Sequence, residues 1–164
     1  MSEEGDGNAA WTAAPLTDLP VSLLVLTGQD LDGAKFDAAM SFPGGIRQAL
    51  KNWRVGPLTT IDDREVRIVQ GTSPNGATIK LYFDPQSGLL VRQQRTLNTP
   101  IGAIPTRVDY ADYRDVAGIK MPFHWAVTWT DGRNIFDVTQ VQPNAPVEAA
   151  RFAEPGPSKP LAAK

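Results

Sequence analysis

Apolar and polar residues alternate with a period of two through most of the chain after residue 52. The clearest runs are 66–68, 79–83, 89–92 and 123–129. This period is typical of half-buried β-strands. Short segments rich in Asp, Asn, Gly and Pro separate the runs, and Asn-Gly and Asp-Gly pairs suit hairpin turns. Because such connections are too short for parallel crossovers, the pattern predicts an antiparallel meander of about six or seven strands.

The pattern before residue 52 is mixed. Residues 10–14 are typical of a short strand, whereas 16–26 are apolar but interrupted by proline and are expected to be extended or irregular. A helical stripe with Thr27 as its N-cap predicts a helix over Asp30–Met40. A shorter helical turn is expected at Ile46–Leu50. The sequence therefore predicts an α+β fold, in which a curved antiparallel sheet is covered by one or two helices.

Length and composition indicate one ordinary globular domain. The chain has 164 residues, of which 41% are hydrophobic and 21% charged. That length allows one substantial core and is short for two. We predict a single domain over residues 10–155, with disordered tails at 1–9 and 156–164, where Gly, Pro and charged residues are frequent.

Charge and residue types disfavour several functions. The net charge is −2, so we expect no nucleic-acid partner. Cysteine is absent, which excludes disulfides, thiolate metal sites and covalent c-type haem attachment within these residues. The longest apolar run, Val21–Leu26, covers about a third of the ~20 residues that cross a bilayer, so we expect no membrane span. The acidic first residues are unlike a signal peptide, so we expect either a cytosolic protein or a fragment whose natural N-terminus was removed.

Four stretches of the sequence resemble a known module. They are IDDREVRIVQG (61–71), KLYFDPQSGLLVRQ (80–93), PTRVDYADYRDVAGIKMPFHW (105–125) and VQPNAPVEAARFAEP (141–155). They resemble the C-terminal module of acidobacterial proteins described as c-type cytochromes or as cytochrome c subunits of photosynthetic-type reaction centres. That module is similar to the lipoprotein-carrier (LolA-like) half-barrel superfamily, and the match covers roughly residues 8–155. Its closing Asn-x-Pro…Arg-Phe…Pro pattern is matched by Asn144, Pro146, Arg151, Phe152 and Pro155.

The resemblance implies a strongly curved half-barrel with helices across its concave side. It also implies a periplasmic or other extracytoplasmic location, and an apolar groove for acyl chains or another hydrophobic partner. The chain departs from the parent proteins because it lacks Cys-x-x-Cys-His. A c-type cytochrome domain would therefore lie upstream in the parent protein, and we expect no cofactor in this chain.

The polar residues of 110–125 and its surroundings are more typical of structure than of catalysis. His124, the only histidine, is expected to point away from the face of its aromatic neighbours and to have no partner. A catalytic histidine needs both a nucleophile and an orienting group. Asp109 and Asp115 share one strand face and Asp112 the other, which makes a poor metal or acid–base cluster. We therefore expect no enzymatic activity.

The apolar residues are the best binding candidates. One helix of about eleven residues is short cover for six or seven strands about 5 Å apart, which favours a groove. The loop Thr99–Pro105 is a candidate lid. The alternative is that the same residues form a filled core, as apolar stripes usually do. The candidate ligand-binding residues are Ile68, Leu81, Phe83, Tyr110, Phe123, Trp125, Val127 and Trp129.

These observations leave two functions open. The first is a non-enzymatic periplasmic domain that binds a lipid, an acyl chain or an apolar partner segment in the concave face of the half-barrel. The alternative is an accessory docking module of a c-type cytochrome electron-transfer protein, with a filled and inert core.

Overall fold

The computed structural model describes residues 2–4, 9–13, 23–41, 45–74, 76–99, 102–148 and 152. The chain forms two compact units, one of Met1–Phe42 with Ala145–Lys164 and the other of Pro43–Asn144. The expected single domain over residues 10–155 spans both units and stays a prediction. All candidate ligand-binding residues belong to the second unit.

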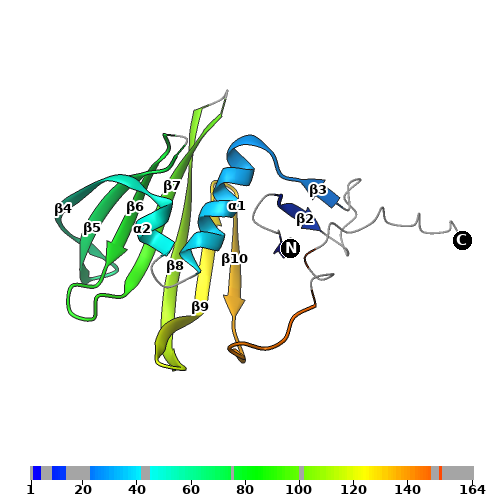
Figure 1. Cartoon of the computed structure of the whole chain (residues 1–164). Helices are drawn as coiled ribbons and strands as arrows, with labels where there is room; N and C mark the ends of the chain where they lie inside the picture. The colour runs from blue at the N-terminus through cyan, green and yellow to red at the C-terminus, as the bar shows by residue number, and fades with distance from the viewer. Residues whose placement is uncertain are drawn as a thin grey trace, which may run out of the picture. The chain divides into compact units, whose positions relative to one another are not determined.

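Among its described residues, the smaller unit contains a three-stranded antiparallel sheet and one α-helix (Figure 1). Its strands, in the spatial order β1-β2-β3, are β1 (Ser2–Glu4), β2 (Trp11–Ala13) and β3 (Leu23–Val25). Strand β2 confirms the strand predicted at residues 10–14. Strand β1 corrects part of the predicted disordered tail, because the unpaired edge of β2 accepts any extended segment, including a polar one. Apart from Ala9, the rest of the two predicted tails lies outside the described residues.

The predicted helix over Asp30–Met40 is confirmed as α1 (Gly28–Met40), which begins two residues earlier. Thr27 is its N-cap, with extended backbone angles, but the Thr27 side chain makes no capping hydrogen bond. At the other end Ser41 Oγ donates to the Asp37 carbonyl at 3.0 Å. The same carbonyl accepts from the Ser41 backbone N–H at 3.2 Å, so Ser41 closes the last turn of the helix with both its side chain and its backbone.

The larger unit is one seven-stranded sheet preceded by a short helix. Helix α2 (Gly45–Ala49) confirms the predicted helical turn and leads directly into the first strand. Neighbours in the spatial order β10-β9-β8-β7-β6-β5-β4 are all antiparallel, which confirms the predicted meander. The sheet is open, with β4 and β10 at its edges. The strands are β4 (Lys51–Ile61), β5 (Arg64–Thr72), β6 (Thr78–Phe83), β7 (Leu90–Thr99), β8 (Gly102–Val116), β9 (Ile119–Trp129) and β10 (Gly132–Asp137).

Two hairpin turns have the backbone conformation that their sequences suggest. Asp62 and Asp63 have φ of 47° and 61°, and Ala117 and Gly118 have φ of 51° and 82°. A two-residue type I′ turn requires positive φ at both central positions, and its twist matches that of the flanking strands. These turns keep successive strands adjacent in space.

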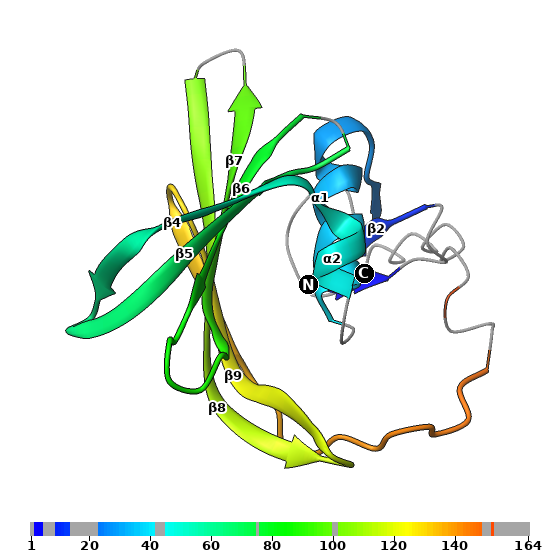
Figure 2. The same ribbon diagram turned by 60° about the vertical axis from the view of Figure 1, so that its left-hand side comes forward.

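The sheet is strongly curved, and α2 lies on its concave side (Figure 2). Part of the bending occurs in β4, whose register against β5 shifts between Lys51 and Arg54 and again between Val55 and Leu58. Extra residues of this kind bend a strand and increase its twist. The curved open meander is the predicted architecture.

The register divides the strand residues between two faces. The concave face bears Gly71, where an ideal Cβ would lie 2.8 Å from Leu50 Cβ, just after α2. Because side chains alternate along each strand, every pairing partner can then be assigned to a face. One row of the concave face is Val69, Leu81, Gln93, Val108 and Val127, and one row of the convex face is Gln70, Lys80, Gln94, Arg107 and Thr128.

More of the buried apolar side chains of the larger unit lie on the concave side than on the convex side. Ile79, Leu81 and Val108 are buried there, and Val66 and Ala126 are buried on the convex side. Within the described part of the chain, no helix has the length and apolar character needed to cross a membrane.

Candidate functional site

Aromatic side chains meet on the concave face across strands β8, β9 and β10. Tyr110, Trp125 and Phe136 lie directly opposite one another in the register. The rings of Trp125 and Phe136 stack with centroids 5.4 Å apart and 15° between their planes. Stacked pairs contribute about 0.5–1.5 kcal/mol beyond burial, so this pair helps to fix the edge strand to the sheet. Phe136 was not predicted, because the run Ile135-Phe136 has no clear alternation.

An aliphatic row continues the same face toward β6. Leu81 has no exposed surface, Val108 is 7% exposed, and Val127 is half-buried. Gln93, which is 1% exposed, places an amide in the middle of this row. The centre of the face is therefore closely packed, with one polar group among aliphatic side chains.

The other predicted aromatic residues lie around this centre. Phe83 is half-buried at the end of β6. Phe123 is 7% exposed, and the Arg114 guanidinium lies over its ring, 4.4 Å from the centroid. Trp129 is 36% exposed and packs so closely on Gly132 that a Cβ there would overlap the indole. The apolar face thus reaches partly exposed positions at the end of β9, and its role in binding stays a prediction.

Ile68 lies on the convex face, so its assignment to the apolar surface of Leu81 is wrong. Ile68 is opposite Tyr82, and Val69 is opposite Leu81. Alternation within one strand does not reveal its register against the next strand. A shift of the register by one residue moves every side chain of the strand to the opposite face of the sheet. Val69 takes the concave position that was expected for Ile68.

Strand β4 adds apolar surface that the sequence pattern did not mark. Trp53, Val55 and Leu58 are 38%, 73% and 41% exposed. Val55 lies opposite Val69 and Leu58 opposite Arg67, which places both on the concave face. The two register shifts interrupt the alternation in KNWRVGPLTT, so a period of two could not identify these positions.

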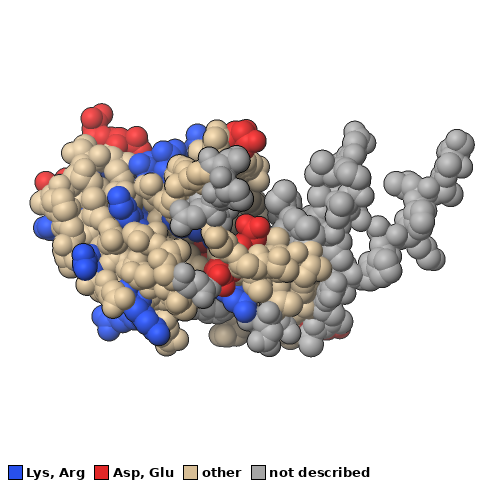
Figure 3. All heavy atoms as spheres, turned by 90° about the horizontal axis from the view of Figure 1, so that it is seen from above, with Lys and Arg blue, Asp and Glu red and all other residues tan. Residues whose placement is uncertain are grey.

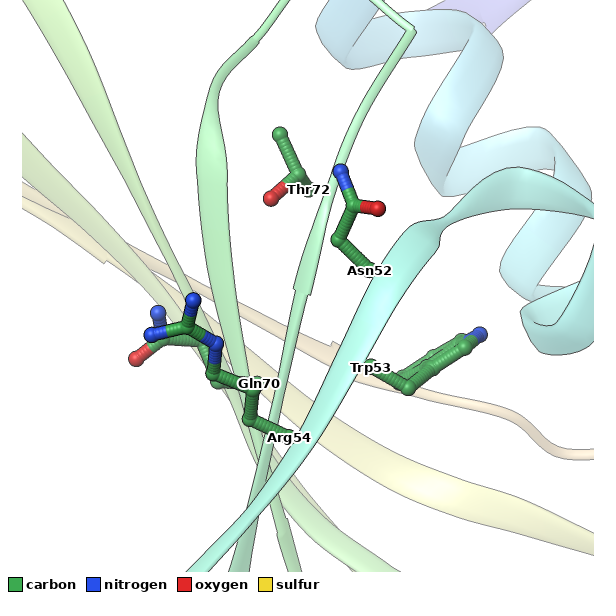
Figure 4. Close-up of a pocket in the computed structure, with 5 residues that line it drawn as sticks. All are labelled: Asn52, Trp53, Arg54, Gln70 and Thr72. Atoms are coloured by element: carbon green, nitrogen blue, oxygen red, sulfur yellow. The ribbon is translucent and has the colours of Figure 1, made fainter.

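A hollow of about 510 Å³ lies beside β4 and β5 (Figure 4). In Figure 4 the Trp53 side chain points away from Arg54, so the hollow meets side chains from both sides of the edge strand. Because four of its five lining residues are polar, it is poorly suited to an acyl chain. The lining residues are Asn52, Trp53, Arg54, Gln70 and Thr72.

Charged side chains form a network at the centre of the convex face. Asp109 Oδ1 accepts a hydrogen bond from the Arg92 guanidinium, which lies directly opposite on β7. The other carboxylate oxygen, Asp109 Oδ2, lies 2.8 Å from Arg107 Nε. Arg92 also lies 3.5 Å from Asp62 in the first hairpin turn. The Arg92 and Asp109 side chains are only 16% and 26% exposed, so solvent screens them less than an open surface pair. The network links β7, β8 and the β4–β5 turn.

His124 has a partner that the sequence analysis did not identify. Its Nδ1 lies 2.7 Å from Asp137 Oδ1, directly opposite on β10. The expected orientation of His124, away from its aromatic neighbours, is confirmed, but the expected lack of a partner is wrong, since strand pairing joins residues distant in sequence. A triad also needs a nucleophile. The nearest positions on the same face are Ala111, Pro122 and Ala126, which carry none.

The other two acidic residues considered as a cluster, Asp112 and Asp115, are each paired with a nearby basic residue. Arg114 Nε donates to Asp112 Oδ1 at 3.1 Å, and this hydrogen bond lowers the pKa of the Asp112 carboxyl. Asp112 has φ of 50° and is left out of the β8–β9 pairing. Asp115 lies 3.7 Å from Lys120, its opposite residue. Among the described residues, no group of three or more His, Cys, Asp or Glu is arranged to hold a metal ion.

The predicted lid Thr99–Pro105 is mostly strand. Strand β8 begins at Gly102 and includes Ile104, so the described part of this segment belongs to the ladder between β7 and β8. Pro105 lies within β8, and proline is compatible with a strand where its missing N–H is not needed. Pro100 and Ile101 lie outside the described residues.

Comparison of the chain with protein-family models, with curated proteins and with solved structures finds no match. The candidate site therefore rests on its own geometry.

Proposed function

We propose that the concave face of the larger unit binds a hydrophobic ligand such as an acyl chain. The observation that carries this proposal is the apolar surface left open at both ends of the face. Val55 and Leu58 are exposed on β4 at one end, and Trp129 is exposed on β9 at the other. Buried apolar side chains on the strands between these two ends complete the apolar face, and an apolar face that stays partly exposed is characteristic of a binding site.

Binding would proceed by burial of the ligand's apolar surface. Each CH₂ group removed from water contributes about 0.8 kcal/mol, so a long chain needs few specific contacts. The stacked rings of Trp125 and Phe136 would form a rigid floor. Tyr110, the next residue in that row, would place a polar hydroxyl near the ligand.

We further propose that the domain is extracytoplasmic, related to the LolA-like half-barrels, and non-enzymatic. The four quoted stretches and the open curved sheet support the relationship. The pairing of His124 with Asp137 supports a structural role for the histidine, since the same bond links the two last strands.

The proposal is tested with a fatty acid that carries a fluorescent dansyl group. We expect saturable binding by the full chain, and native mass spectrometry of the purified protein should show co-purified lipid. Trp129→Ser removes the exposed apolar side chain at the β9 end of the concave face. If the ligand loses about 50 Å² of apolar contact, binding weakens about eightfold at ~25 cal/mol per Å².

Ile135→Ser is the matched control. Ile135 is also an exposed apolar residue, 55% exposed, but it lies on the convex face opposite Ala126. Its substitution should leave the affinity unchanged. Equal effects of the two substitutions, or no probe binding by a folded protein, would overturn the proposal and favour the docking module with a filled core.

A further inference from the structure

The two faces of the large sheet differ in charge as well as in polarity. The whole chain has a net charge of −2. On the convex face, the strands carry eight basic side chains against three acidic ones. The basic residues are Lys51, Arg54, Arg64, Lys80, Arg92, Arg107, Lys120 and Arg133, and the acidic ones are Asp109, Asp115 and Asp137.

Part of this charge forms a continuous row across all seven strands of the curved sheet. Successive members of the row are direct partners in the register, and cations occupy every second strand with neutral polar residues between them. Because neighbouring strands are about 4.8 Å apart, the cations recur about every 10 Å over about 29 Å. The row consists of Arg54, Gln70, Lys80, Gln94, Arg107, Thr128 and Arg133.

Three of the four cations in the row are available to a ligand. Arg54, Lys80 and Arg133 are exposed, and within the described part of the chain none of them makes an ion pair or a side-chain hydrogen bond. Arg107 contacts Asp109, but that carboxylate is shared with Arg92. Figure 3, seen from above, shows Lys and Arg side chains together with Asp and Glu side chains over the part of the surface where Figure 1 places β4, β5 and β6.

We propose that the convex face docks the protein on an anionic lipid bilayer. The charge is spread across a broad convex surface, which suits a surface of many separate anionic headgroups. Single-stranded nucleic acid is usually held in a basic groove with aromatic stacking platforms. The row has no aromatic member, and the nearby Tyr82 hydroxyl is engaged with the Gln94 side chain at 3.2 Å.

The contact is expected to be weak and reversible. A basic side chain at an anionic membrane surface contributes about fivefold in affinity, and the attraction falls off within a Debye length. A flat surface meets a convex sheet near its middle first, so Lys80 and Arg107 make the closest approach, and the long arginine side chains at the ends extend the contact. This inference goes beyond the proposed ligand site and does not depend on it, because it concerns the opposite face.

Co-sedimentation of the full chain with lipid vesicles tests the inference. We expect binding to phosphatidylcholine vesicles that contain phosphatidylglycerol, loss of that binding at high salt, and no binding to phosphatidylcholine alone. The double variant Lys80→Gln/Arg133→Gln should bind more weakly by at least about fivefold, and by about 25-fold if the edge residue Arg133 contacts the membrane as fully as Lys80 does. Within the described part of the chain neither residue makes an ion pair or a side-chain hydrogen bond, and circular dichroism should confirm that the variant folds.

The matched control is Arg47→Gln/Arg67→Gln. It removes the same charge from exposed residues of α2 and of the concave face of β5. It should retain vesicle binding. An equal loss in both double variants would overturn the inference, because net charge alone would then explain the effect. Binding to polyglutamate or to single-stranded DNA but not to anionic vesicles would overturn it as well.

Discussion

Tyr113 connects the end of β8 to the start of β7. Its hydroxyl donates to the Leu90 carbonyl at 2.6 Å, and burial raises the pKa of the Tyr113 hydroxyl to about 12 from its ordinary value of 10. The folded protein therefore retains the proton more strongly than the unfolded chain does. The stabilisation is fully present below pH 10 and is lost as the pH rises from 10 to 12.

The variant Tyr113→Phe tests this linkage. At neutral pH it should lower the free energy of unfolding by about 1 kcal/mol, because one hydrogen bond is lost. Phenylalanine cannot ionise, so the difference between the two proteins should shrink as the pH rises from 10 to 12. Urea unfolding of both proteins at neutral pH and between pH 10 and 12 measures the difference in their free energies of unfolding. A difference that stays constant would show that the Tyr113 hydroxyl titrates equally in both states.

At the residue scale, the sequence predicted side-chain direction better than side-chain partners. Alternation along β9 correctly placed His124 away from Phe123 and Trp125. It could not reveal Asp137, because the partner is decided by the register between β9 and β10. The misplacement of Ile68 has the same cause, since register depends on the neighbouring strand rather than on the strand's own pattern.

At the scale of elements, α2 is anchored to the sheet by a close approach to β5. An ideal Cβ at Gly71 would lie 2.8 Å from Leu50 Cβ and 2.9 Å from Leu50 Cδ1. Leu50 is 2% exposed, so it has little room to move. Gly71→Ala should therefore destabilise the protein by about 1–3 kcal/mol through overpacking.

A double-mutant cycle tests the cause of that loss. Leu50→Ala alone should cost about 2–5 kcal/mol, as expected for a buried leucine. In Gly71→Ala/Leu50→Ala the alanine methyl enters the space left by the leucine, so the double variant should be more stable than the sum of the two losses predicts. Denaturant unfolding of the four proteins gives the coupling. Additive losses would mean that the added methyl group is opposed by the Trp53 ring, whose Cε3 lies 3.3 Å from the ideal Cβ position, and not by Leu50.

The strands that the sequence predicted well are those with an uninterrupted period. Strand β9 follows one alternating pattern and was found. Helix α1 was found from its N-cap and a few apolar positions, although its apolar and polar residues are only weakly segregated. Strand β4 was not recognised as an apolar element, because two register shifts break its alternation. The segment Thr99–Pro105 suggests a lid because Ile101 and Ile104 flank a glycine, but its described residues pair within the sheet.

At the scale of the whole molecule, the large sheet separates two kinds of surface. Its concave face is aromatic and aliphatic, and its convex face carries most of the basic residues of the strands. A membrane contact on the convex side would leave the concave side free for a ligand. The two proposals are therefore separable by experiment, since Trp129→Ser and the Lys80/Arg133 double variant change opposite faces of one sheet.

The division of the chain into two compact units yields a last prediction, that residues 43–144 fold alone. This segment contains all seven paired strands of the large sheet and its own anchored helix, α2. Seven of the buried apolar residues also lie within it, namely Leu50, Val66, Ile79, Leu81, Val108, Phe123 and Ala126. A domain of about 100 residues is large enough to form a stable core by itself.

We therefore expect the isolated segment 43–144 to show a β-rich circular dichroism spectrum and one cooperative unfolding transition. The dispersion of its amide NMR signals should match that of the same residues in the full chain. If the segment is instead collapsed without a cooperative transition, the sheet needs the first unit to complete its core. In the folded case, dansyl-fatty-acid binding by the segment alone would localise the ligand site to the larger unit, and loss of that binding in Trp129→Ser but not in Ile135→Ser would assign it to the concave face.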